Sequence, residues 1–368
     1  MEMRALVVRD FDAGAELLDL AVEPPRGQEV LVRMKASGIC GSDLKFLDGQ
    51  SHVGVLPTIM GHEGAGTVAE VGPEVTEFRP GDHVAVAMAT SCGACPDCAR
   101  QQLHLCSSPD RTLQIEGKMA DGTSRFRLDG MAAYPFVGSG TLAEYVVAAA
   151  RKLVKVPPGV PLESAAISAC GVVTGLGAAL NIARPEPGSS ALIIGCGGVG
   201  LSVIQGCRIA GSTRIVAVDT NVLRLETARR VGATDVIEAG SESVADAVRS
   251  LLPAGVDHAF EVSGAVANLE LAFSATRRGG NCVAVASYPP GARVSVDTWD
   301  LFWDRQLRGC VAGNSVPRHD LPRIFDLFLG GQLDLEALTA ASWGLADVHH
   351  AIEASRRGEV PRAVVTFS

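Results

Sequence analysis

Aromatic side chains and positive charge are both scarce in this chain of 368 residues. Only 5% of its residues are aromatic, and 32 lysines and arginines face 41 aspartates and glutamates, which gives a net charge of −9 and a pI near 5.4. An acidic surplus argues against a general binder of nucleic acids or anionic membranes. The 41 glycines follow no fixed period, which excludes a collagen-like chain.

Signals for export and for membrane insertion are also weak. Residues 1–10 lack the long apolar core of a signal peptide. Residues 164–183 and 188–207 contain no Asp, Glu, Lys or Arg, but both are rich in glycine and neither is flanked by a basic cluster or an aromatic belt, which disfavours a membrane hairpin. We therefore expect a cytoplasmic protein without a membrane partner. Its cysteines are expected to serve as metal ligands or structural thiols rather than disulfides.

The length and the hydrophobic fraction of 47% suggest two domains, each with its own core. The first 160 residues contain short β-like runs broken by glycine and proline, at 5–8, 30–34, 67–71, 83–87 and 142–148, which predicts a β-rich domain. From about residue 170, apolar strands at 192–194, 215–218, 235–237, 259–262 and 282–285 alternate with amphipathic helices. This alternation predicts a parallel sheet covered by helices. The pattern ends near Gly309, and the remaining tail could return to complete the first domain.

A glycine-rich turn follows the strand at 192–194. The sequence there is Gly195-Cys196-Gly197-Gly198-Val199-Gly200, and a helix is predicted directly after it. In such a turn the first glycine permits the tight bend, the second lets a pyrophosphate approach, and the third allows close helix packing. The next strand ends at Asp219, whose carboxylate would bind an adenosine ribose and repel a 2′-phosphate. The order predicts an NAD site; a plain glycine turn with Asp219 as a helix cap is the alternative.

Cysteines also cluster within a short segment. Cys92, Cys95 and Cys98 are spaced by two residues each, and Cys106 follows after seven more. Four thiolates at this spacing can form a tetrahedral cage around Zn²⁺ with no position left for substrate, so we expect a structural zinc site. An iron–sulfur cluster is the competing use of four cysteines.

Three dispersed segments complete the pattern: Gly38-Ile39-Cys40-Gly41-Ser42-Asp43, Gly61-His62-Glu63-Gly64-Ala65-Gly66, and Cys170-Gly171. With the cysteine segment and the glycine turn, in this order, they resemble the zinc-dependent medium-chain alcohol dehydrogenases over essentially the whole chain. The resemblance implies an α/β protein with two domains. A GroES-like β-rich catalytic domain would comprise residues 1–171 and 312–368, and a Rossmann coenzyme domain with a doubly wound parallel sheet would comprise residues 172–311.

The resemblance also implies a catalytic zinc held by Cys40, His62 and Cys170. Glu63 would lie beside the metal and approach it during ligand exchange, and Asp43 would orient His62. Ser42 matches the position that accepts the proton of the alcohol. Many relatives carry a histidine three residues later, where this chain has Lys45, so a lysine, His52 or solvent would complete the proton relay.

Several coenzyme contacts follow from the same resemblance. Thr174 and Val199 match positions that pack against the nicotinamide ring, Arg224 matches a basic residue near the adenosine ribose, and Arg362 resembles the arginine that binds the pyrophosphate. Relatives often carry a second arginine directly after the first zinc cysteine. Gly41 stands there, which implies a looser grip on the pyrophosphate.

The implied activity is NAD-linked interconversion of an alcohol and its aldehyde or ketone, with one catalytic and one structural zinc per chain. Oxidation of the thiol adduct of formaldehyde is the main alternative, supported weakly by Arg111, and a catalytically silent homologue is an alternative of another class. Segments 121–126 and 138–145 resemble the long-loop branch of the family, which implies a homodimer through the coenzyme domains. Candidate substrate-pocket residues are Ser42, Lys45, Met88, Met131 and Tyr288; they do not identify the alcohol.

Overall fold

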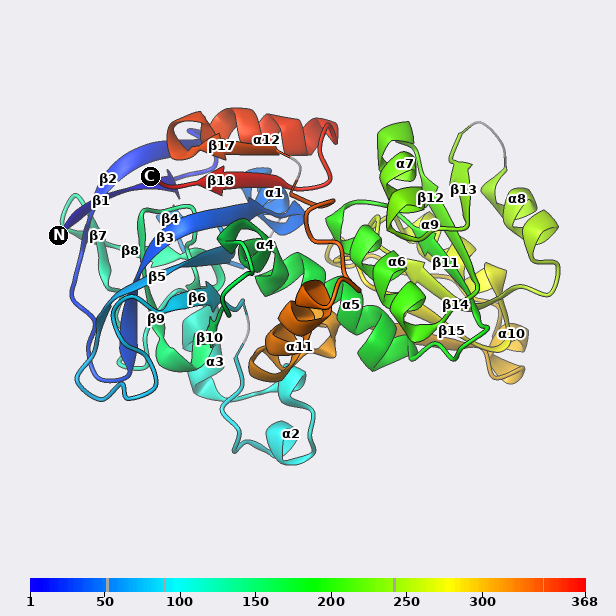
Figure 1. Cartoon of the computed structure of the whole chain (residues 1–368), viewed down its shortest axis with the longest axis horizontal. Helices are drawn as coiled ribbons and strands as arrows, with labels where there is room; N and C mark the ends of the chain where they lie inside the picture. Colours follow the sequence, from blue (N-terminus) through cyan, green and yellow to red (C-terminus); the bar gives the residue numbers. More distant parts are fainter. Residues whose placement is uncertain (51–52, 89, 241–242, 340) are drawn as a thin grey trace. The chain divides into compact units, whose positions relative to one another are not determined.

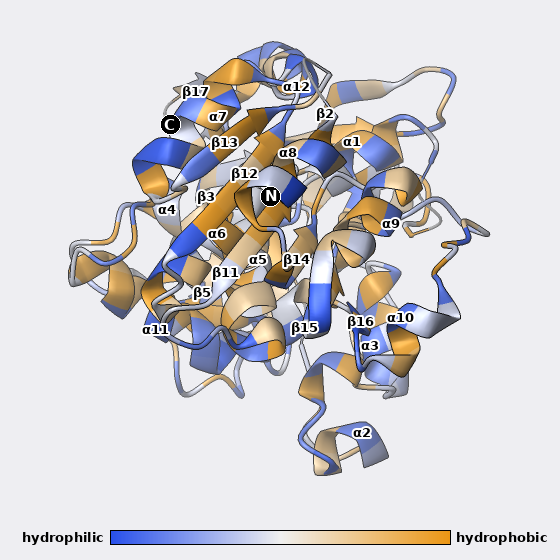
Figure 2. Ribbon diagram, turned by 90° about the vertical axis from the view of Figure 1, so that its right-hand side faces the viewer, coloured by the Kyte–Doolittle hydropathy of each residue, from blue (hydrophilic) through white to orange (hydrophobic). Residues whose placement is uncertain are grey.

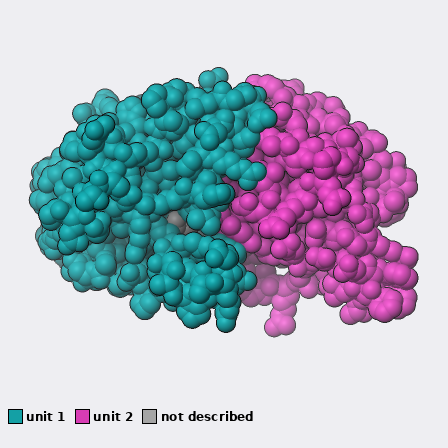
Figure 3. All heavy atoms as spheres, turned by 60° about the horizontal axis from the view of Figure 1, so that its bottom comes forward, with its two compact units in different colours: residues 1–170, 316–368 teal, residues 171–315 magenta. Residues whose placement is uncertain are grey.

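The computed structural model describes residues 1–50, 53–88, 90–240, 243–339 and 341–368, so His52 lies outside the described residues. The chain divides into two compact units (Figure 3). Unit 1 comprises residues 1–170 and 316–368, and unit 2 comprises residues 171–315. The C-terminal tail belongs to unit 1 because β18 (Ala363–Thr366) pairs antiparallel with β3 (Glu29–Ile39).

Unit 1 is built from a closed barrel and a second sheet (Figure 1). The barrel has the order β1-β2-β7-β8-β4, with bounds Glu2–Val8, Ala15–Val22, Phe126–Leu128, Met131–Pro135 and Thr58–Ile59. The sheet has the order β10-β6-β5-β3-β18-β17, and β9 also pairs with β3. Its other strands are β10 (Leu153–Lys155), β6 (His83–Val86), β5 (Glu63–Val71), β17 (Ala341–Gly344) and β9 (Tyr145–Ala149). Each β-like run predicted in the first 160 residues overlaps one of these strands.

In the described part of unit 1, four α-helices are short, and the two longer ones lie in the C-terminal tail. They are α1 (Gly41–Leu47), α2 (Pro96–Ala99), α3 (Pro109–Ile115), α4 (Leu162–Ile167), α11 (Pro317–Leu329) and α12 (Val348–Arg357). Strand β3 is buried along most of its length, and Val30, Val32 and Met34 belong to the main apolar core of the unit. This core holds the end of β3, and with it Cys40, in a fixed position.

Unit 2 contains a parallel six-stranded sheet with the order β13-β12-β11-β14-β15-β16. The bounds are Asp235–Glu238, Arg214–Asp219, Ser190–Ile194, Val256–Glu261, Thr276–Ala284 and Gln306–Gly309. The helices are α5 (Val173–Gly177), α6 (Gly198–Ala210), α7 (Val222–Val231), α8 (Val244–Leu251), α9 (Val266–Ala275) and α10 (Thr298–Phe302). The strand order 3-2-1-4-5-6 is that of the Rossmann fold, as the sequence predicts. Figure 2 shows hydrophobic residues along its central strands, as expected for a sheet covered on both faces.

A continuous helical segment, Leu162–Ala183, comprises α4, η4 (Ser168–Val172), α5 and η5 (Ala178–Ala183). Among the described residues it is the one helix long and apolar enough to cross a membrane, but 83% of its most apolar window is buried inside the protein. Such burial is typical of a core helix. Its η4 part is a π-helical turn, a feature that occurs frequently at functional sites, and this turn contains Cys170.

Candidate functional site

Four buried side chains of unit 1 converge on one point: Cys40, His62, Glu63 and Cys170, called here the buried cluster. One ligand atom from each lies within 4.8 Å of the others. Cys40 caps α1 directly after β3, and His62 and Glu63 lie at the start of β5. Because β3 and β5 pair with Gly38 opposite Glu63, the register brings these distant segments together. The structure thus unites the ligands predicted for a catalytic metal.

Asp43 contacts two residues of the buried cluster, His62 and Cys40. Its Oδ1 atom lies 3.0 Å from His62 Nδ1, and its Oδ2 atom accepts a hydrogen bond of 2.9 Å from the backbone N–H of Cys40. His62 Nε2 is buried and makes no hydrogen bond with the described residues. An imidazole fixed by a carboxylate, with its other nitrogen left open beside two thiols, is a donor set that fits zinc. Asp43 thus contacts His62, the residue that the family resemblance expects it to orient.

Electrostatics within the cluster favour the thiolate form of Cys40 and the protonated forms of Cys170 and Glu63. The hydrogen bond from Cys170 lowers the pKa of the Cys40 thiol well below its usual value. Burial raises the pKa of Glu63 to about 8, although the positive charge of Arg362 opposes this shift. Arg362 Nη2 donates to Glu63 Oε1 at 2.7 Å. Gly38 makes this packing possible, since a Cβ atom there would lie 2.3 Å from Glu63 Oε2.

Arg362 is thus placed by the fold beside the buried cluster. Ala363 pairs with Ile39 in the β18–β3 ladder, and Arg362 Nη1 donates to the carbonyl of Ile39 at 3.3 Å. The side chain is 7% exposed. The sequence motif at the C-terminal end predicts a pyrophosphate contact for this arginine but gives no sign of its pairing with Glu63.

Two apolar side chains contact residues of the buried cluster. Met88 Sδ lies 3.6 Å from Cys170 Sγ, which places this predicted pocket residue beside the cluster. The ring of Phe136 packs edge-on against His62, with 5.6 Å between the ring centroids. No sequence signal distinguishes Phe136, which is one apolar residue among many in its segment. Met131, predicted for the same pocket, instead lies at the β7–β8 hairpin with 66% of its surface exposed.

The predicted relay residues lie on α1. Ser42 occupies the first turn and is exposed, whereas Lys45 is half-buried in the last turn. The capping residue Cys40 and the buried Asp43 share this helix with them. Helix α1 therefore joins the hydroxyl proposed for proton transfer to two groups of the buried cluster.

The second cysteine group lies in residues 92–106, called here the four-cysteine loop. One sulfur from each of Cys92, Cys95, Cys98 and Cys106 lies within 4.8 Å of the others. Backbone N–H groups point at these sulfurs: Cys95 N donates to Cys92 Sγ at 3.3 Å, and Cys92 N donates to Cys106 Sγ at 3.4 Å. A backbone hydrogen bond with Cys98 is the main cause that lowers the pKa of Cys95 to about 6. Burial instead raises the pKa of Cys98. Four sulfurs this close together fit a closed metal site.

In unit 2 the glycine-rich turn joins β11 to α6. Gly195 has φ of 100°, and a Cβ atom on Gly200 would lie 1.9 Å from the carbonyl oxygen of Gly195. These two positions therefore require glycine. A Cβ atom on Gly197 would meet nothing within 4 Å, which leaves open space at the position predicted to face a pyrophosphate. Gly198 and Val199 form the start of α6, whose N-terminus attracts anions.

Asp219 lies next to this turn. Its Oδ2 atom accepts a hydrogen bond of 2.7 Å from the backbone N–H of Cys196, and its Oδ1 atom accepts one of 2.9 Å from Asn221. Arg224 Nη1 lies 3.9 Å from Asp219 Oδ2. The carboxylate therefore links the glycine turn to the start of α7, at the carboxyl end of β12 where the Rossmann fold binds the ribose.

Two further predicted residues are placed within unit 2. Thr174 lies in α5, where a Cβ atom on the adjacent Gly175 would be 2.3 Å from the carbonyl of Val199, so α5 packs tightly on the start of α6. Tyr288 donates its hydroxyl hydrogen bond to the buried carboxylate of Glu261. This contact was not expected from the sequence.

Comparison with known proteins identifies the family of the chain. The family model of the alcohol dehydrogenase GroES-like domain matches residues 26–158, and that of the zinc-binding dehydrogenases matches residues 198–330. The chain is 35% identical over 370 residues to an S-(hydroxymethyl)glutathione dehydrogenase of Escherichia coli, with both chains fully covered.

Solved structures give the same result. An alcohol dehydrogenase zinc-binding domain protein from Burkholderia ambifaria is 33% identical, with a TM-score of 0.94 over 100% of this chain and 99% of that one. Benzyl alcohol dehydrogenase from Acinetobacter calcoaceticus is 29% identical, with a TM-score of 0.93 and full coverage of both chains. The chain therefore belongs to the zinc-dependent medium-chain alcohol dehydrogenase family.

Proposed function

We propose that this protein is a zinc- and NAD-dependent dehydrogenase that interconverts an alcohol with its aldehyde or ketone. The observation that carries the proposal is the convergence of Cys40, His62 and Cys170, with the buried Nε2 atom of His62 left open. A zinc ion held there would act as a Lewis acid and lower the pKa of a bound alcohol. We propose further that units 1 and 2 correspond to a catalytic domain of residues 1–171 and 312–368 and a coenzyme domain of residues 172–311.

The chain's own residues divide the remaining tasks. Asp43 holds the His62 ring with Nε2 open for a zinc ion, and the ion pair with Arg362 would keep Glu63 beside such an ion. The Ser42 hydroxyl accepts the alcohol proton and passes it to Lys45 or solvent. Ser42→Ala should therefore lower the oxidation rate far more than the affinity for coenzyme, and an unaffected rate would place the relay elsewhere.

We propose two zinc ions per chain, one in the buried cluster and a structural one in the four-cysteine loop. The second donor set offers four sulfurs and leaves no ligand position for substrate. Metal analysis of freshly purified protein should return two zinc ions per chain. A single ion, or iron with acid-labile sulfide, would contradict this assignment.

NAD is the proposed coenzyme because the carboxylate of Asp219 lies at the carboxyl end of β12, where a bound ribose would be expected. A carboxylate there repels the 2′-phosphate of NADP, so Asp219→Gly should shift the ratio of kcat/KM values toward NADP. Asp235→Gly, on the neighbouring strand β13, removes an ion pair with Arg214 and serves as the control that should leave the ratio unchanged. Unchanged selectivity in Asp219→Gly would show that this carboxylate does not face the ribose.

A homodimer is proposed through unit 2. Helix α10 exposes Trp299 and Phe302, which are 61% and 68% exposed and stacked on each other, and β16 ends the described sheet as an edge strand. An exposed aromatic patch beside an open strand edge suits pairing with a second copy. Phe302→Asp should convert the dimer to a monomer in sedimentation velocity, whereas an unchanged species would exclude this surface. A cytoplasmic location remains part of the proposal.

Oxidation of a thiol adduct of formaldehyde is the second candidate, favoured by the 35% identity to S-(hydroxymethyl)glutathione dehydrogenase. Arg111, the weak sequence support for it, donates through Nη1 to the carbonyls of His104 and Cys106 at 2.8 and 3.4 Å, so part of its guanidinium is already occupied. A turnover screen with NAD decides between the candidates. It compares aliphatic, aryl and allylic alcohols with formaldehyde, each with and without glutathione; no turnover by protein with both metals bound would favour the silent homologue.

A further inference from the structure

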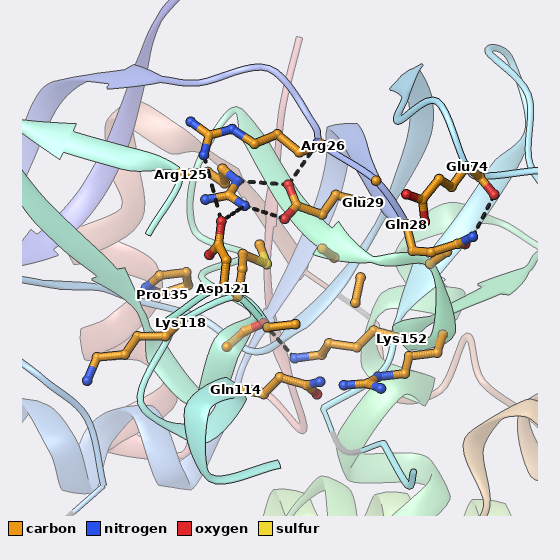
Figure 4. A pocket seen from close by; sticks show the side chains of 18 of the residues that line it. Arg26, Gln28, Glu29, Glu74, Gln114, Lys118, Asp121, Arg125, Pro135 and Lys152 are labelled. Atoms are coloured by element: carbon orange, nitrogen blue, oxygen red, sulfur yellow. Dashed lines mark hydrogen bonds and ion pairs between the residues drawn. The ribbon is translucent and has the colours of Figure 1, made fainter. Parts of the chain in front are cut away.

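Unit 1 contains a cavity of about 550 Å³ to which no role has been assigned (Figure 4). None of its lining residues belongs to the buried cluster or to the four-cysteine loop. Its walls come from the start of β3, from the segment after α3, and from residues 148–152 at the end of β9. The volume lies within the range of about 300–1,000 Å³ that is typical of small-molecule sites.

Two buried cations line this cavity, and they differ in their partners. The guanidinium of Arg125 is paired with the carboxylates of Glu29 and Asp121, at 2.6 and 2.7 Å (Figure 4). Lys152 is 2% exposed, and its Nζ atom donates to the carbonyls of Val137 and Gly138 and to the hydroxyl of Ser139. Arg125 is therefore neutralised, whereas every acceptor of Lys152 is uncharged.

The charge of Lys152 is not compensated within the described part of the chain, where it forms no ion pair with a carboxylate. Burial and the positive charge of Arg151 lower the pKa of Lys152 to about 7. A buried ammonium normally pairs with an anion, because desolvation is otherwise costly. A ligand that brings a negative charge would supply the missing partner.

We propose that this cavity binds a small organic carboxylate. Its carboxylate pairs with Lys152, and its apolar body contacts the side chains of Ala148, Ala149 and Met119 on the cavity wall. Binding at this site does not require the proposed dehydrogenase reaction to take place.

The acceptors of Lys152 connect the cavity with the buried cluster. Val137 and Gly138 belong to η2 (Phe136–Gly138), in which Val137 has φ of 44°. Phe136, the first residue of this turn, packs edge-on against His62. An anion that takes a hydrogen bond from Lys152 loosens the hold of the lysine on η2. We therefore expect occupancy of the cavity to change the turnover of the zinc-loaded enzyme, although binding itself is the test of the proposal.

Binding is measured by calorimetric titration of the zinc-loaded protein with 4-bromobenzoate. The wild type should bind the probe, and Lys152→Met should bind it at least tenfold more weakly. The matched control is Lys155→Met, because Lys155 is 56% exposed on β10 and does not line the cavity. No binding to the wild type, or equal binding to Lys152→Met, would overturn the proposal.

A crystal of the wild type soaked in 4-bromobenzoate locates the probe without any variant, so a Lys152→Met protein that fails to fold does not block the test. A bromine anomalous peak in the cavity, with the carboxylate beside Lys152, supports the site. Peaks at the buried cluster alone, or binding at crystal concentration only with no heat in the titration, would overturn it. Neither measurement uses turnover, so failure here and failure of the dehydrogenase activity are distinguishable.

Discussion

In unit 1, the ligand atoms of the buried cluster come from residues 40, 62, 63 and 170, whereas those of the four-cysteine loop all come from residues 92 to 106. The first set is assembled by the register of β3 and β5 and by a π-helical turn. The second set is assembled by the local path of the chain around the short helix α2, and Cys92 and Cys95 are only half-buried. The buried cluster therefore depends on the tertiary fold of unit 1, whereas the four-cysteine loop depends on the local conformation of residues 92–106.

This difference separates what each metal would contribute. The buried cluster lies against an apolar core that includes Met34, Phe46 and Phe136, so the surrounding structure should persist without a metal. The four-cysteine loop has little core of its own, and a structural zinc site supplies folding free energy directly. Loss of the first site should affect chemistry, and loss of the second should affect stability.

The largest expected effect is on turnover in Cys40→Ser. Removal of one thiolate from the buried cluster removes a Lewis acid worth several kcal/mol, so turnover should fall by about 10³-fold. The far-ultraviolet circular dichroism and the Tm should stay close to wild type, because the core is unchanged. The control is Cys310→Ser, a half-buried cysteine outside both clusters. Turnover within tenfold of wild type in Cys40→Ser would contradict a catalytic metal at this position.

Cys98→Ser tests whether the four-cysteine loop depends on its metal for local stability. Cys98 is buried in the four-cysteine loop, and its loss should release one zinc ion per chain and make residues 92–106 at least about tenfold more sensitive to limited proteolysis. The remaining zinc, in the buried cluster, should stay bound. If Cys98→Ser loses both zinc ions, the two sites are not independent. That result would contradict the contrast between the buried cluster and the four-cysteine loop.

An intermediate effect is expected from Asp43→Asn. The amide would still reach His62 Nδ1 but would no longer supply the negative charge that orients and polarises the imidazole. Loss of such a partner typically lowers metal affinity by about 10–100-fold, which a competing chelator can measure. Asp97→Asn, in the four-cysteine loop, should leave the affinity of the buried cluster unchanged. An equal loss in both variants would indicate a general charge effect instead.

The same contrast decides which features could be predicted from the sequence. The four-cysteine loop could be predicted from spacing alone, since its ligands are neighbours in the chain. The Rossmann sheet and Asp219 could be predicted because strand, glycine turn and acid follow one another. Cys40, His62 and Cys170 are individually uninformative and required the family pattern. The Arg362–Glu63 pair and the contact of Phe136 with His62 depend on strand register and side-chain packing, for which a single sequence carries no local signal.

The smallest effect is expected from loss of the contact between Phe136 and His62. Phe136→Leu removes an edge-on aromatic contact with His62, an interaction worth about 0.5–1.5 kcal/mol, so metal affinity at the buried cluster should fall by about two- to tenfold. Phe126→Leu, in the barrel core, is the matched control: it should lower the free energy of unfolding without changing metal affinity. Equal metal affinity in Phe136→Leu and wild type would show that Asp43 alone orients the imidazole. In that case η2 and the lysine that holds it would have no influence on the metal site.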